Sequence, residues 1–78
     1  MSLKTAFSRE VLHARTSLGL TQEQVAEAAS ISVRWYQYIE SGTFLPSSVV
    51  TLRLILLLGI DVEIFREEAE LIVPLSTR

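Results

Sequence analysis

Residues 19–42 read GLTQEQVAEAASISVRWYQYIESG, and this stretch decides the fold. Near its start, Thr21 is a typical helix N-cap, and Gln24, three residues later, completes a capping box. The pattern predicts a helix over residues 22–29. Its apolar face is small, which lets another helix approach closely, and it consists of Val25, Ala26 and Ala29.

A second helix is predicted over residues 33–41, with Ser32 as its N-cap. Residues 30–32 alone separate the two helices, and helices joined by so short a turn cross steeply. This is the geometry of a helix-turn-helix, in which the second helix enters the major groove of DNA. The side chains expected to point from this segment into the core are Ile31, Trp35, Tyr36 and Ile39.

Three further helices are predicted on either side of this stretch. The first covers residues 3–18, where apolar side chains recur at helical spacing. Ser47 and Asp61 are typical N-caps of the other two, over residues 48–58 and 62–70. The buried stripe of the first helix is expected to contain Phe7, Val11, Ala14 and Leu18.

Length and composition limit the class of protein. Seventy-eight residues correspond to one domain, 1–78, with a core over about residues 4–70 and a C-terminal arm, 71–78, that is a strand or extended. An apolar content of 49% excludes disorder, and no apolar run reaches the roughly 18 residues of a membrane span. The absence of cysteine fits a reducing cytoplasm. His13 has no partner at metal-ligand spacing, so we expect no metal site. Thr5, Ser8 and His13 lack a third orienting group, and five short helices offer no deep pocket, so we expect no enzyme activity and no cofactor.

The charge of the chain is unevenly distributed. The net charge of −2 argues against a nucleic-acid partner when it is taken alone. However, residues 1–53 carry five basic and four acidic side chains, whereas residues 54–78 carry two basic and five acidic ones. A polyanion would therefore approach the first part and be repelled by the second.

The order of these signals resembles the Cro/phage-repressor family, also called XRE-type regulators, over about residues 9–65. The resemblance is carried by the segment from Gly19 to Ser32, then Tyr36, Ile39-Glu-Ser-Gly42, Pro46-Ser and Leu58-Gly-Ile60. It implies an all-α, compact five-helix, lambda-repressor-like DNA-binding domain whose helix-turn-helix is formed by its second and third helices.

The resemblance also implies roles for individual residues. Arg34 would read guanine and Gln37 adenine through paired hydrogen bonds, and the base-contacting set would be Val33, Arg34, Gln37 and Tyr38. Phosphate contacts would come from Thr21, Gln22, Ser32 and Arg9. Arg15 and Glu40 match a family pair that forms a salt bridge between the first helix and the end of the third.

The chain departs from the family pattern in three places, one of which is the helix over residues 48–58, where Val49 and Leu56 stand at positions that are usually charged in the family. Ser30 stands where the family has a turn glycine, so a left-handed backbone there would carry some strain. The loop Thr43-Phe44-Leu45 lacks the Lys or Arg that often contacts phosphates in the family, which lowers the expected electrostatic affinity for DNA.

The helix over residues 48–58 is apolar nearly all round, which predicts burial on every side. A core this small cannot cover it, so we expect a homodimer whose interface includes Phe44, Leu45, Val49, Leu56, Leu71 and Val73. The alternative is that the chain folds back and covers this helix within one monomer, through Ile64, Phe65, Leu71 and Val73.

Three functions are compatible with the sequence. The first is a cytoplasmic, nucleoid-associated transcriptional regulator, most simply a repressor, that binds an inverted repeat of double-stranded DNA as a homodimer. The second is an antitoxin-like module that binds both DNA and a toxin protein. The third is a protein-interaction module that has kept the fold and lost DNA binding.

Overall fold

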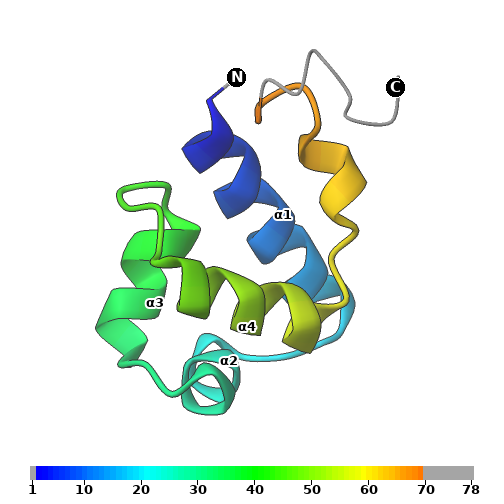
Figure 1. Ribbon diagram of the computed structural model, residues 1–78. Helices are drawn as coiled ribbons and strands as arrows, with labels where there is room; N and C mark the ends of the chain where they lie inside the picture. Colours follow the sequence, from blue (N-terminus) through cyan, green and yellow to red (C-terminus); the bar gives the residue numbers. More distant parts are fainter. Residues whose placement is uncertain (1, 70–78) are drawn as a thin grey trace.

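The computed structural model describes residues 2–69, and every regular element in that part of the chain is a helix (Figure 1). The all-α prediction is therefore confirmed. The elements are α1 (Leu3–Ser17), α2 (Gln22–Ala29), α3 (Val33–Glu40), α4 (Ser48–Leu58) and the short 3₁₀ helix η1 (Val62–Phe65). The predicted arm 71–78, with Leu71 and Val73 of the expected dimer interface, lies outside the described residues.

Side-chain caps begin the helices where the sequence places them. Thr21 Oγ1 accepts a hydrogen bond from the Gln24 amide at 3.0 Å, and the Gln24 side chain accepts one from the Thr21 amide at 2.8 Å. Ser32 and Ser47 cap α3 and α4 in the same way. Each cap satisfies amides that have no partner within the helix. The caps therefore determine the residue at which each of α2, α3 and α4 begins.

The prediction of a fifth α-helix over residues 62–70 is wrong. After the cap at Asp61 the chain forms one 3₁₀ turn, Val62–Phe65, and then turns over residues 66–69. The β-branched side chains of this turn lower its helix propensity. Phe65 is buried and packs against Phe7 of α1, with the ring centroids 5.8 Å apart. This contact holds η1 against α1.

The core lies where the four α-helices and η1 meet. In Figure 1, α1 packs against α3, α4 and η1, and α2 packs against α3 and α4. The small side chains of Ala26 and Ala29 let α2 approach α3 and α4 closely, and both residues are fully buried. The largest fully buried side chains are Tyr36, Ile39, Leu54, Val11 and Val25.

Two residues expected in the core lie at the surface. Leu18 is 55% exposed because it caps the end of α1, beyond the last turn that faces the core. Trp35 is 37% exposed. The inner face of α3 is filled by Tyr36 and Ile39, and Trp35 stacks instead on Phe44 from the following loop.

One face of α4 is apolar and exposed. Leu54 and Leu58 are buried, whereas Leu56 on the opposite side is 80% exposed. Phe65, one of the residues expected to cover α4 within a monomer, packs against α1, and its neighbour Ile64 is exposed. None of the helices formed by residues 2–69 is long and apolar enough to cross a membrane.

Candidate nucleic-acid interface

A three-residue turn joins α2 to α3 and sets their crossing. Ser30 adopts a left-handed conformation, with φ 61° and ψ 41°, and is the one non-glycine residue with positive φ in the described chain. The amide of Ile31 donates to the carbonyl of Ala26 at 3.0 Å, which closes the end of α2. Ser32 then caps α3 immediately, so the two helices share one rigid corner.

The outer face of α3 gathers the four residues expected to contact bases. Arg34 and Gln37 are exposed and Tyr38 is partly exposed, whereas Val33 is partly exposed and also packs against the core. The opposite face of the same helix holds Tyr36 and Ile39 in the core. The expected base-contacting set is therefore brought together on one side of one helix.

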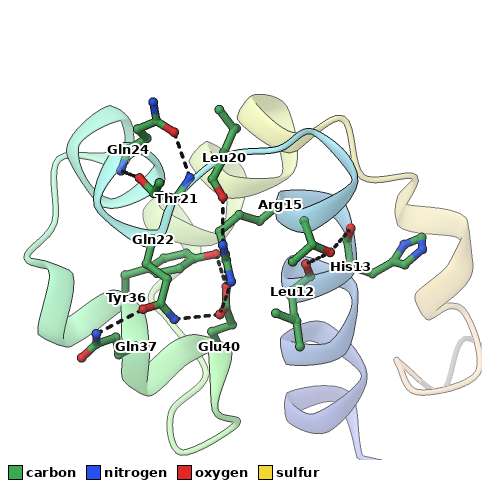
Figure 2. Close-up of polar contacts among 11 residues, drawn as sticks. Leu12, His13, Arg15, Leu20, Thr21, Gln22, Gln24, Tyr36, Gln37 and Glu40 are labelled. Carbon is green, nitrogen blue, oxygen red and sulfur yellow. Dashed lines mark hydrogen bonds and ion pairs between the residues drawn. The ribbon is translucent and has the colours of Figure 1, made fainter.

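Glu40, at the end of α3, accepts hydrogen bonds from three other residues (Figure 2). Arg15 of α1 donates from Nε to Oε2 at 2.7 Å and from Nη2 to Oε1 at 2.9 Å. Tyr36 donates its hydroxyl to Oε2 at 2.6 Å, and Gln22 donates from Nε2 to Oε1 at 2.8 Å. Arg15 also donates to the carbonyl of Leu20 at 2.8 Å. This network, which we call the Glu40 network, ties α1, α2 and α3 to one carboxylate.

The network shifts the protonation equilibria of its members. Burial acts to raise the pKa of Glu40, but the hydrogen bonds from Arg15, Tyr36 and Gln22 outweigh it and hold the pKa below its ordinary value. The hydrogen bond with Glu40 raises the pKa of Arg15. Burial, reinforced by Glu40, raises the pKa of the Tyr36 hydroxyl well above its usual 10.0. Near neutral pH the network therefore contains an ionised Glu40, an ionised Arg15 and a neutral Tyr36.

Gln22, an expected phosphate contact, is also part of this network. Its Nε2 donates to Glu40, and its Oε1 accepts a hydrogen bond from Gln37 Nε2 at 3.2 Å (Figure 2). One N–H of the Gln22 amide is left for a ligand. The resemblance to the family predicts the Arg15–Glu40 pair but not the part that Tyr36 and Gln22 take in it. The spacing of Tyr36 and Glu40, one helical turn apart, was the available signal for Tyr36.

Three aromatic rings pack together beside Arg34. Trp35 and Phe44 stack with their centroids 5.0 Å apart, and Tyr38 meets Phe44 edge-on at 5.5 Å. Arg34 donates from Nε to the Tyr38 hydroxyl at 3.2 Å, and its guanidinium carbon lies 6.0 Å from the centre of the Tyr38 ring. We call Trp35, Tyr38 and Phe44 the aromatic cluster. The loop after α3 thus lies against the outer face of that helix.

The other expected site residues lie on three different parts of the molecule. The side chains of Thr21 and Ser32 are exposed at the N-termini that they cap. Arg9 lies on the side of α1 that faces η1, where it lines a shallow pocket with Phe65 and Glu68, apart from the outer face of α3. The expected interface residues of α4 and its preceding loop are all exposed: Phe44, Leu45, Val49 and Leu56.

Arg53, which the sequence analysis left without a role, joins α4 to the end of α2. Its Nη1 donates to the carbonyl of Ala29 at 3.1 Å, where a helix end has no partner of its own. Across residues 2–69 no group of acidic or histidine side chains is arranged to hold a metal ion.

Comparison with known proteins agrees with this geometry. The model of the helix-turn-helix domain family matches residues 6–70 of the chain. A protein of Bacillus subtilis (strain 168), named "Uncharacterized HTH-type transcriptional regulator YqaF", is 44% identical over 54 residues, which cover 69% of this chain and 71% of YqaF. No solved structure matches the chain.

Proposed function

This chain belongs to the helix-turn-helix domain family, and on that basis we propose that it is a sequence-specific regulator of transcription that binds double-stranded DNA. The similarity to a protein named as an HTH-type transcriptional regulator supports the regulatory role. The observation that carries the proposal is the outer face of α3, where Arg34 and Gln37 are exposed on a helix held in place by the Glu40 network. The proposal assigns no catalytic activity and no cofactor.

In the proposed complex α2 and α3 form the helix-turn-helix, and α3 lies in the major groove. Arg34 reads guanine, Gln37 reads adenine, and Val33 packs against a thymine methyl group. Tyr38 contacts a base or a phosphate beside Arg34. Phosphates are bound at the N-termini of α2 and α3, where free amides attract anions, by Thr21, Gln22 and Ser32. The proposal does not depend on Arg9, which faces η1.

We further propose that two copies pair through the exposed face of α4. The apolar side chains of this face include Val49, Leu52 and Leu56, each more than half exposed. A two-fold dimer buries the same patch on both chains and places two α3 helices in successive major grooves, about 34 Å apart. Such a dimer binds an inverted repeat. It represses most simply by occupying a promoter, in the cytoplasm and on the nucleoid.

A second candidate function is a protein-interaction module, either alone or together with DNA binding as in an antitoxin. It is favoured by the uncharged loop of residues 43–45 and by the exposed aromatic cluster, where the family pattern predicts a basic side chain. A net charge of −2 also weakens non-specific attraction to DNA. A protein partner of this kind would bind Phe44, Leu45 and the segment of residues 71–75.

Binding-site selection from a pool of random duplexes, at moderate salt, tests the first function. We expect enrichment of an inverted repeat whose half-site centres lie about one helical turn apart. Arg34→Ala should weaken binding to that site by about 1–3 kcal/mol and relax the preference at one base position. Arg66→Ala is the matched control, because Arg66 is an exposed arginine paired with Glu63 on η1 and its loss should leave the selected site unchanged. Folded protein that enriches no sequence would favour the protein-interaction function instead.

A further inference from the structure

We propose that Tyr38 and Phe44 are positioning residues for Arg34, so that the aromatic cluster sets base preference by acting through this arginine. The inference rests on the proposed function, in which α3 enters the major groove. It gives a role to the loop after α3, whose residues Thr43-Phe44-Leu45 carry no charge with which to bind phosphates.

The hydrogen bond between Arg34 and Tyr38 leaves the reading edge of the arginine available. Arg34 uses Nε to donate to the Tyr38 hydroxyl at 3.2 Å. The guanidinium has five N–H donors, so the four on Nη1 and Nη2 stay available, and two suffice for the O6 and N7 acceptors of guanine. Tyr38 therefore holds the guanidinium through Nε and does not compete with guanine for Nη1 and Nη2. The hydrogen of the Tyr38 hydroxyl remains free to donate to a phosphate.

Tyr38 is itself fixed by the loop. The amide of Thr43 donates to the Tyr38 carbonyl at 3.0 Å, and so does the amide of Phe44 at 3.4 Å. The Phe44 ring meets the Tyr38 ring edge-on and stacks on Trp35. Backbone and ring contacts thus connect the loop to Tyr38, and Tyr38 to Arg34, in one contiguous chain of contacts.

An Arg34 side chain that Tyr38 already holds should recognise one base more specifically. The reason is that a long side chain loses rotamer freedom when it binds. An arginine that is already held loses less of that freedom on binding, and its guanidinium is also restricted to one direction. A cation held against an aromatic ring gains a further attraction at an exposed site. We therefore expect the support to sharpen preference at the single base that Arg34 reads.

Tyr38→Phe is the informative variant because it keeps the ring and removes the acceptor for Arg34 Nε. In binding-site selection we expect preference at the Arg34 base to fall by about threefold, as the loss of one exposed hydrogen bond implies, with the other positions unchanged. Phe44→Leu should have the same effect at the same base, because the Phe44 ring packs against the Tyr38 ring and Tyr38 in turn holds Arg34. Thermal unfolding of each variant shows whether the fold is retained.

A double-mutant cycle with Arg34→Ala separates positioning from direct contact. If Tyr38 acts through Arg34, Tyr38→Phe should cause no further change of base preference in the Arg34→Ala background. Loss of a phosphate contact by the Tyr38 hydroxyl would lower the affinity for every sequence alike and leave this comparison of preferences unaffected. An equal loss of base preference in both backgrounds, a loss of preference at positions other than the one that Arg34 reads, or an unchanged preference in Tyr38→Phe would each overturn the inference while leaving the proposed function intact.

A measurement on the free protein keeps the two proposals distinguishable. The Arg34 Nε–H resonance in a proton–nitrogen spectrum should be protected from exchange with water, and Tyr38→Phe should remove that protection. If the wild-type chain selects no DNA, the proposed function fails and base reading by Arg34 fails with it, whatever this spectrum shows. An unprotected Nε–H in the wild type would overturn the positioning contact on its own.

Discussion

At the residue scale, Glu40 is the side chain on which the candidate interface depends most. The Arg15–Glu40 pair is nearly buried, with side-chain exposures of 14% and 7%, whereas the Arg66–Glu63 pair is more than half exposed. Exposed ion pairs contribute little to stability, but removing one member of a buried pair leaves an uncompensated charge. Glu40 also orients Gln22, so its loss affects both the fold and the DNA-facing surface.

Glu40→Gln should therefore destabilise the protein by about 2–4 kcal/mol at neutral pH, because Arg15 then lacks its counter-charge. The loss should shrink as the pH falls. A carboxyl whose pKa is lowered in the folded state stabilises the protein above its ordinary pKa of 4.5, and that contribution disappears as the pH falls through the folded value. Urea unfolding between pH 3 and pH 7 measures both effects.

Glu63→Gln is the matched control for this prediction. Glu63 also has a lowered pKa, from its hydrogen bond with Arg66, but it is exposed to solvent. Its loss should change the unfolding curve far less than the loss of Glu40. Equal effects of the two substitutions would contradict the view that burial gives the Glu40 network its weight.

At the element scale, local capping signals predict helix bounds well, and tertiary contacts decide the rest. The predicted bounds of the four α-helices agree with the structure to within one residue. Caps such as Thr21 and Ser32 are readable in the sequence because each accepts a hydrogen bond from an amide only three residues later. The short η1 and the exposure of Trp35 were not predictable in this way. Both depend on a distant ring, Phe7 for η1 and Phe44 for Trp35, that the local pattern does not contain.

In the candidate site too, local patterns predict some features and tertiary contacts decide the others. Helical periodicity is enough to place Arg34 and Gln37 on the outer face of α3, opposite Tyr36 and Ile39. The entry of Gln22 into the Glu40 network is different, because it depends on how steeply α2 crosses α3. The three-residue turn predicts a steep crossing, but no spacing along the sequence gives the angle closely enough to place Gln22 beside Glu40.

Ser30→Gly tests the turn that produces this crossing. Ser30 holds a left-handed conformation that costs a non-glycine residue about 1–2 kcal/mol. Glycine costs about 0.4–1 kcal/mol through its greater freedom in the unfolded chain, so Ser30→Gly should stabilise the protein by about 0.5–1 kcal/mol. Ala28→Gly, two residues earlier on the exposed side of α2, is the control and should destabilise by about 1 kcal/mol. Thermal unfolding compares the two, and a loss of stability in Ser30→Gly would show that the left-handed turn carries no strain.

At the scale of the whole molecule, the exposed apolar face and one group of acidic side chains belong to elements other than α3. The acidic residues between 61 and 68 belong to η1 and the segments on either side of it, while the proposed DNA-reading face belongs to α3. In Figure 1, η1 lies beside α1, against which it packs. The exposed apolar face belongs to a third element, α4. A chain with this arrangement is suited to bind a polyanion with one surface and a second copy with another.

Leu56→Glu tests the second of these surfaces. Leu56 is 80% exposed, so glutamate there should leave the isolated monomer folded, whereas in a two-fold dimer it would bring two carboxylates into an apolar interface. We expect the wild type to sediment as a dimer and the variant as a monomer at the same concentration, with equal helix content by circular dichroism. The variant should also lose most of its affinity for the full inverted repeat and keep its affinity for a half-site.

The control for this experiment is Leu12→Glu, which makes the same substitution at an exposed leucine of α1. That variant should remain a dimer, since α1 lies outside the proposed interface. A Leu56→Glu protein that sediments as the wild type does, or a wild type that stays monomeric while it binds the inverted repeat, would show that α4 does not form the dimer. In the second case two separate monomers would have to bind the two half-sites, whereas in a preformed dimer the second α3 helix would bind its half-site at a high effective concentration.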